Sequence, residues 1–118
     1  DSNGSFESSK IFATGLNIPI GILPVGDGAI CFSIPNIWYL KDNDGDGVCD
    51  ERSVLYGPFD TTRDTHGMVN SLRDGHDGWI YACHGFNNQS VVRGKDGHEV
   101  AMNSGNIFRF RLDGSRIE

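Results

Sequence analysis

The residues best suited to chemistry lie in one acidic stretch, Asp42 to Glu51. It reads DNDGDGVCDE and places Asp42, Asp44 and Asp46 at alternate positions, followed directly by a glycine. A loop that curls around an ion turns every second side chain inward, and carboxylate oxygens are hard ligands that suit Ca²⁺. The spacing therefore predicts a Ca²⁺ loop that follows the first six positions of an EF-hand loop.

The second half of this loop departs from the EF-hand pattern. Val48 stands at the seventh position and Asp50 at the ninth, but Ser53 occupies the twelfth position, where an EF-hand has glutamate. The predicted ligands are Asp42, Asp44, Asp46, the Val48 carbonyl oxygen, Asp50 and Glu51. The alternative is a solvated acidic hairpin loop. Clustered carboxylates repel one another unless a cation neutralises them, which favours the ion.

Histidines are concentrated in a second segment, which runs from Asp64 to Gly85 and holds three of the four. A histidine can act as a general base, and a nearby carboxylate can orient its ring. Since Asp64 lies two residues before His66, His66 is the candidate catalytic base, and Asn70 is a candidate cofactor-binding residue. The alternative is that His66 only satisfies a turn. The sequence has no HxH or HxxxH zinc spacing and no GxSxG motif.

Charge and composition limit the class of protein. The net charge is −6, and the 10 Lys and Arg residues are scattered, so a nucleic-acid partner is not expected. No apolar run approaches the roughly 20 residues of a transmembrane span, so none is expected. A length of 118 residues allows one domain at most. A hydrophobic share of 37% with 16 glycines suits a turn-rich β protein.

The first residue and the cysteines bear on processing, disulfide pairing and haem attachment. The chain starts at Asp1 rather than Met, which indicates a processed or excised chain. The three cysteines are Cys31, Cys49 and Cys83, an odd number, and their pairing stays open. Cys83-His84 matches the end of a c-type haem attachment motif. Position 80 is isoleucine, however, so no covalent haem is expected in this chain.

Short alternating apolar runs, separated by Gly, Asp, Asn and Pro, predict an all-β fold. The predicted strands are Lys10–Thr14, Ile20–Pro24, Ala29–Ser33, Asn36–Lys41, Ser53–Tyr56, Met68–Arg73, Trp79–His84, Asn106–Arg111 and Arg116–Glu118. Sequences such as VGDG and LDGS fit tight turns between them, because Asp and Gly tolerate unusual backbone angles.

The predicted strands repeat along the chain. AIC at 29–31 matches WIY at 79–81, and IWYL at 37–40 matches IFRF at 107–110. Three strands that lead out of such units also correspond, namely KIF at 10–12, SVL at 53–55 and RI at 116–117. A unit of four antiparallel strands, about 43 residues long, is typical of a β-propeller blade. The alternative is a small β-sandwich with two similar halves.

The repeat predicts one partial propeller over 1–118, with a first blade at about 18–57 and a second at about 66–118. A polar insertion over 86–104 separates the second and third strands of the second blade. Propellers have about four to eight blades, so the chain is expected to be a fragment or subunit of a larger propeller. The acidic loop would join the third and fourth strands of a blade, which favours a structural ion. His66 would precede an inner strand, where a propeller opens onto its central channel.

Three motifs carry a resemblance to a known family: LKDNDGDGVCDE at 40–51, THGMVNSL at 65–72 and NSGNIFRFRLDG at 103–114. With the segments around them, the sequence from about Lys10 to Glu118 resembles the propeller of PVC-type (planctomycete-type) membrane-bound dehydrogenases. These are similar to the soluble glucose and sorbosone dehydrogenases that use pyrroloquinoline quinone (PQQ).

The resemblance implies a six-bladed propeller whose channel holds PQQ and a small sugar or alcohol substrate. It also implies an exported, for example periplasmic, protein, often with a c-type cytochrome domain as electron acceptor. In the sugar dehydrogenases a histidine at the start of an inner strand takes the substrate hydroxyl proton while hydride passes to the quinone, and His66 matches it by motif. The residues that hold the PQQ carboxylates belong to later blades, so Arg73 and Arg93 are not equated with them.

Two hypotheses for function follow. In the first, the chain is part of a PQQ-dependent sugar or alcohol dehydrogenase, with His66 as base, PQQ held together with other blades, and structural Ca²⁺ in the acidic loop. In the second, it is a non-catalytic propeller-type module that binds or assembles with other subunits. Turnover with PQQ and a sugar separates the two.

Overall fold

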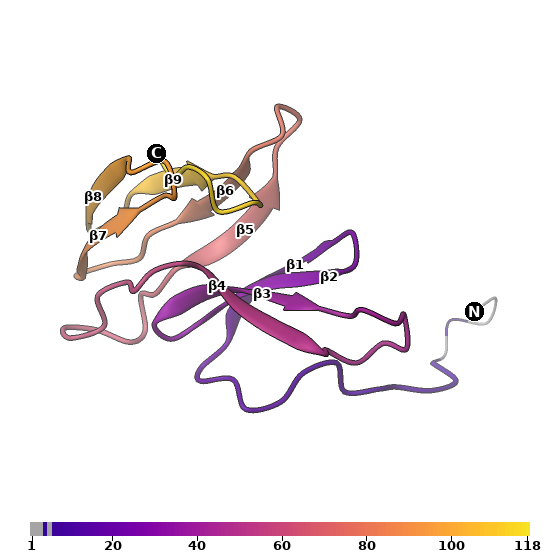
Figure 1. Ribbon diagram of the computed structural model, residues 1–118. Coiled ribbons are helices and arrows are strands. Elements are labelled where there is room, and N and C mark those ends of the chain that lie inside the picture. Colours follow the sequence, from indigo (N-terminus) through magenta and orange to yellow (C-terminus); the bar gives the residue numbers. More distant parts are fainter. Residues whose placement is uncertain (1–3, 5) are drawn as a thin grey trace.

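The computed structural model describes residue 4 and residues 6–118, and this part of the chain is built from β-strands and connections alone (Figure 1). The strands are β1 (Ile20–Val25), β2 (Gly28–Ser33), β3 (Asn36–Lys41), β4 (Glu51–Tyr56), β5 (Asn70–Asp74), β6 (Ile80–Cys83), β7 (Gln89–Arg93), β8 (Glu99–Asn103) and β9 (Ile107–Phe110). Across these described residues there is no helix of the length and apolarity that a membrane span requires.

Strands β1 to β4 form a four-stranded antiparallel sheet in chain order, here called sheet A. Apolar residues alternate along its strands, and because successive side chains point to opposite faces, the register assigns each to a face. Ile30 pairs with Leu23 and Tyr39 on the face that packs into the core. Cys31 pairs with Ile22 and Trp38 on the opposite face. Sheet A is therefore apolar on both sides.

Strands β5, β6 and β9 form the second sheet, here called sheet B. A single bridge between Phe110 and Ile117, together with two backbone hydrogen bonds between Arg109 and Glu118, adds a short fourth row beside β9. Strands β7 and β8 pair only with each other, as a separate hairpin. Sheet B thus has the strand order of sheet A, with the hairpin placed between its second and third members.

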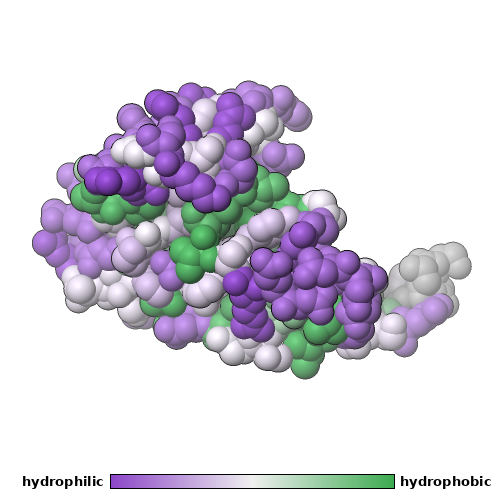
Figure 2. Space-filling model, viewed as in Figure 1, coloured by the Kyte–Doolittle hydropathy of each residue, from purple (hydrophilic) through white to green (hydrophobic). Residues whose placement is uncertain are grey.

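The core lies between the two sheets, and apolar residues gather along this seam in Figure 2. Strand β1 lies beside β5, so the first strands of the two sheets are neighbours. A chain of aromatic contacts links the sheets, with the Phe32 and Phe59 rings 5.8 Å apart and the Phe59 and Phe108 rings also 5.8 Å apart. Each fully buried large apolar side chain contributes roughly 1.5–3 kcal/mol, so this seam is the main source of stability.

Two predicted features differ from the structure. Lys10–Thr14 is not a strand, because its backbone carbonyl groups bond to a loop and to a side chain: Phe12 O accepts from Cys49 N, and Thr14 O accepts from Arg52. The segment 86–104, predicted as a polar insertion, contains the β7–β8 hairpin, which buries one side in the core. Its buried residues include Ser90, Val92 and Met102.

Antiparallel pairing places successive connections at alternate ends of sheet A. The β1–β2 turn and the acidic β3–β4 loop share one end, where Asp42 N donates to Asp27 O at 2.8 Å. The β2–β3 turn and the β4–β5 connection share the other end, where Phe59 N donates to Pro35 O at 2.8 Å. We call these the loop end and the histidine end, because the second connection carries His66. The described residues form two facing sheets and a hairpin, and they do not close into a ring of sheets.

Candidate functional sites: an acidic loop and a histidine end

The acidic loop is tied at its base to the sheet that carries it. Asp50 N donates to Lys41 O at 2.8 Å, and Asn43 N donates to Asp50 Oδ2 at 2.8 Å, which closes the loop. The two oxygens of Asp42 accept from Gly45 N at 2.7 Å and from Gly47 N at 2.8 Å. These backbone donors, with Gly47 first, hold the pKa of Asp42 below its usual value, so this carboxylate stays ionised.

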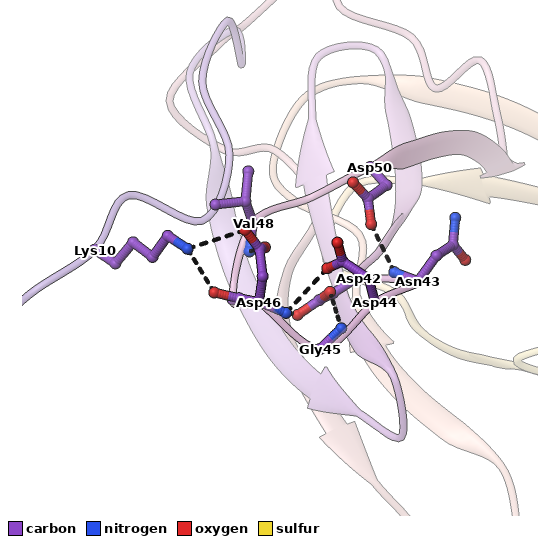
Figure 3. Close-up of polar contacts among 9 residues, drawn as sticks. Lys10, Asp42, Asn43, Asp44, Gly45, Asp46, Val48 and Asp50 are labelled. Carbon is purple, nitrogen blue, oxygen red and sulfur yellow. Dashed lines mark hydrogen bonds and ion pairs between the residues drawn. The ribbon is translucent and has the colours of Figure 1, made fainter.

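Three of the predicted ligands meet, as Figure 3 shows. Asp42, Asp44 and Asp50 each offer an oxygen within 4.8 Å of the other two. Three hard oxygen donors on a short loop fit the chemistry of Ca²⁺, which takes six to eight oxygens, some of them from water and carbonyl groups. The arrangement could hold a hard divalent cation through these three side chains.

The other predicted ligands lie elsewhere in the loop. Asp46 faces Lys10, whose Nζ lies 3.1 Å from Asp46 Oδ2 and 2.5 Å from Asp46 O (Figure 3). Val48 N donates to Asp46 Oδ1 at 2.8 Å. Glu51 is exposed at the start of β4, paired with Lys41. The structure therefore gathers the first, third and ninth positions of the loop and directs the fifth toward a lysine of the preceding segment.

His66 lies at the opposite end of the sheets. Its side chain is 97% exposed, and its Nδ1 lies 3.2 Å from Asp64 Oδ1, which also accepts from His66 N at 2.8 Å. These contacts, led by the backbone donor, lower the pKa of Asp64. An anionic carboxylate at Nδ1 favours the tautomer with a proton on Nδ1 and a free acceptor at Nε2. The pair has the geometry of an oriented base, although no cavity encloses the ring.

Asn70, the predicted cofactor-binding residue, has both of its polar groups in local contacts. Its Nδ2 donates to Met68 O at 2.9 Å, and its Oδ1 accepts from Ser71 Oγ at 2.9 Å. The half-buried side chain shapes the entry into β5. A polar cavity of about 300 Å³ is lined instead by Arg63, Asn87, Asn88, Gln89, Asn103 and Ser104.

Asn88 is a positioning residue for the histidine end. It is buried, and its Oδ1 accepts from Asp64 N at 3.1 Å while its Nδ2 donates to Asp64 O at 2.7 Å. This side chain fixes the backbone of Asp64, and through it the His66 pair. No local sequence signal marks Asn88, because its partner lies 24 residues away.

The three cysteines are free thiols in the structure. Cys31 is buried on the outward face of sheet A, and burial raises the pKa of its thiol. Cys49 lies in the acidic loop and Cys83 ends β6, and both are half-buried.

A family model matches the whole chain, residues 1–118, and its description is "Domain of unknown function (DUF7133)". The chain belongs to the DUF7133 family. No curated protein and no solved structure matches it. The family description states no activity for this DUF7133 domain.

A buried histidine gives the DUF7133 domain a predicted acid sensitivity. Ser90 Oγ accepts from Asp60 N at 2.9 Å and lies 2.8 Å from His84 Nε2, so the serine links the ring to the β4–β5 connection. The other ring nitrogen, Nδ1, is buried without a hydrogen-bond partner. Burial lowers the pKa of His84 from 6.5. Protonation would place a charge in this apolar site.

We expect the free energy of unfolding to fall as the pH drops below about 6.5. The unfolded histidine binds its proton at higher pH than the folded one, so between the two pKa values His84 adds a slope of at most about 1.4 kcal/mol per pH unit. Urea unfolding of wild type and His84→Gln between pH 7.5 and 5 measures the difference. The exposed His98 supplies the control, His98→Gln, which should keep the wild-type slope. A slope unchanged by His84→Gln would contradict this account.

Proposed function

We propose that this domain is part of an exported, PQQ-dependent sugar or alcohol dehydrogenase-like β-propeller, with His66 as its base and a structural Ca²⁺ in the acidic loop. The observation that carries the proposal is the His66–Asp64 pair, in which a carboxylate with a lowered pKa lies 3.2 Å from the ring. The facing sheets, with β1 beside β5, support the propeller part because adjacent blades place their inner strands together.

The residues of this chain would supply one proton-transfer step. Asp64 holds the proton of His66 on Nδ1, which leaves Nε2 free to accept a proton from a substrate hydroxyl group. Asn88 keeps Asp64 in place through two hydrogen bonds. When the hydroxyl proton moves to Nε2, the carboxylate of Asp64 stabilises the resulting imidazolium, as a carboxylate behind a catalytic histidine does.

PQQ does not fit a site made by this chain alone. Its carboxylates need several cationic side chains, and the cation nearest the polar cavity, Arg63, contacts Gln89 Oε1 at 3.4 Å. Asn70 is engaged with Met68 and Ser71. We therefore assign to this domain the base and not the cofactor cradle, which other blades would have to provide.

The acidic loop fits the structural role in the proposal. It lies at the loop end, one strand length or roughly 17–20 Å from the connection that carries His66. An ion there would be too distant to polarise a substrate at His66. Its effect would be to neutralise Asp42, Asp44 and Asp50 and to hold a nine-residue connection in one shape.

The second candidate is a non-catalytic assembly module, and it also has an observation in its favour. His66 is 97% exposed and lies outside any cleft, whereas a base normally works in a site that excludes water. If the domain is an assembly module, the histidine end only connects the two sheets. A variant of His66 distinguishes the two candidates.

We expect His66→Gln to lower turnover by about 10²- to 10⁴-fold in the complete propeller that contains this domain, because general base catalysis contributes a factor of that size. Dye reduction with PQQ, Ca²⁺ and a panel of sugars and alcohols measures turnover. His98→Gln, at an exposed turn of the hairpin, should leave it unchanged. Equal rates for wild type and His66→Gln would exclude His66 as the base, and no turnover by wild type would favour the assembly module.

A further inference from the structure

The outward face of sheet A carries a continuous apolar row. Ile22 pairs with Cys31, Cys31 with Trp38, and Trp38 with Val54, so one residue from each of the four strands lies in register. Ile22 is 65% exposed and Val54 is 51% exposed. An apolar face on a four-stranded sheet normally packs against a second layer. The opposite face of sheet A already packs against sheet B.

The segment before β1 crosses this outward face from one end to the other, and in Figure 1 it runs along the side of sheet A away from sheet B. It is anchored at the loop end by Lys10 on Asp46, and at the histidine end by Asn17 N, which donates to Ser33 Oγ at 2.8 Å. The segment does not fill the face, because cavities of about 310 and 140 Å³, both open to solvent, lie between it and the sheet.

The chain also takes a corresponding path along sheet B. β4 and the connection after it follow sheet B as residues 10–17 follow sheet A. The Tyr56 hydroxyl lies 2.8 and 2.9 Å from the carbonyl oxygens of Arg111 and Arg116, at the outer turn of sheet B. Asp60 N donates to Ser90 Oγ at 2.9 Å at the other end, much as Asn17 N donates to Ser33 Oγ. The repeated sequences KIF at 10–12 and SVL at 53–55 occupy corresponding places in these two paths.

One difference separates the two paths: β4 is hydrogen-bonded to β3, whereas Lys10–Thr14 has no neighbouring strand among the described residues. We propose that Lys10–Thr14 is the outermost strand of a third four-stranded sheet, and that the other three strands come from a partner segment outside residues 10–118. That partner is a three-stranded antiparallel sheet with an apolar face, which packs on the Ile22–Val54 row and pairs its free edge with Lys10–Thr14. The inference rests on the proposed propeller segment.

A second copy of this chain fits the face poorly. The outward face of sheet B is polar, with Arg109 Nη1 3.4 Å from Tyr81 Oη and Arg109 Nη2 3.3 Å from Glu118 Oε2. Packing that face against the apolar row would bury these charged groups, which is costly. The outer edge of sheet B is also occupied already, by the pairing of Arg109 with Glu118. A partner with an apolar face and a free edge has neither difficulty.

Photo-cross-linking of the complete propeller that contains this domain tests the proposal. p-Benzoylphenylalanine replaces Ile22 in one variant and Ile11 in another; Val91, as exposed as Ile22 at 65% but on the hairpin, is the control position. We expect both probes to link to one segment outside residues 10–118 that forms three antiparallel strands. The amide hydrogens at alternate positions of Lys10–Thr14 should exchange with solvent about 100-fold more slowly in the complete propeller than in residues 1–118 alone, because hydrogen bonds to a neighbouring strand protect them.

Cross-links to a second copy of this chain, links no stronger than those of the Val91 control, or unprotected amides would each overturn the proposal. Circular dichroism of each labelled variant checks that it is folded. Neither readout depends on turnover, so this test can fail while the His66 test succeeds, and the reverse.

Discussion

Replacing Gly85 with alanine is expected to destabilise the protein strongly. A Cβ atom at Gly85 would lie 1.5 Å from Gly67 O and 2.0 Å from Gly67 C, and both are backbone atoms that cannot turn aside. Gly67 faces the same restriction, since its own Cβ would lie 2.7 Å from Phe86 N. The two glycines let the entry into β5 touch the exit from β6, so the contact sets both the sheet B geometry and the position of His66.

We expect Gly85→Ala to cost at least about 3 kcal/mol, a large part of the 5–15 kcal/mol that stabilises a typical domain. Urea unfolding followed by circular dichroism measures the cost. Gly26→Ala is the matched control: its Cβ would meet no atom within 4 Å, and its φ of 25° should cost only about 1 kcal/mol. Similar unfolding midpoints for the two variants would show that the close approach of Gly85 and Gly67 is not needed.

The four strands of sheet A could be predicted well from the sequence. Asn36–Lys41 was predicted with the bounds of β3, because alternating apolar residues and flanking Pro and Asp residues mark both ends. The pairing of the second and third strands in each sheet also agrees with the repeat, since β2 pairs with β3 and β6 with β9. Local alternation is a sufficient signal where both neighbouring strands are close in the chain.

Long-range partners account for what the sequence could not show. Lys10–Thr14 alternates like a strand, but a strand needs a neighbour, and none lies beside it in the described part of the chain. In β7 the inward positions include Ser90, a polar residue that is buried because it bonds to Asp60 and His84. That polarity hid the period-two pattern of the hairpin, although the Asp96-Gly97 turn was a usable signal.

In the candidate sites, too, local contacts could be predicted from the sequence and long-range contacts could not. The spacing of Asp42, Asp44 and Asp50 indicated that their side chains would meet, and it depends only on the local path of the loop. The contact of Asp46 with Lys10 spans 36 residues and depends on how the preceding segment crosses sheet A. Asn88 could not be recognised as the support of Asp64 for the same reason.

Saturating Ca²⁺ is expected to stabilise the protein strongly. A ligand at a hundredfold excess over its dissociation constant adds about 2.7 kcal/mol, which for a domain of this size raises the melting temperature by roughly 10–15 °C. The effect should vanish in the triple variant Asp42→Asn, Asp44→Asn and Asp50→Asn, which removes the three gathered carboxylates. Asp113→Asn is the control, because Asp113 lies in the corresponding turn of sheet B and outside the cluster.

We propose that the acidic loop binds a structural ion, separate from any chemistry at the histidine end. The melting temperature with EDTA and then with Ca²⁺, measured for wild type, the triple variant and His66→Gln, tests it most directly. We expect an equal rise for wild type and His66→Gln and none for the triple variant. A wild-type melting temperature unmoved by either addition, or a rise lost in His66→Gln, would contradict the proposal of a structural ion.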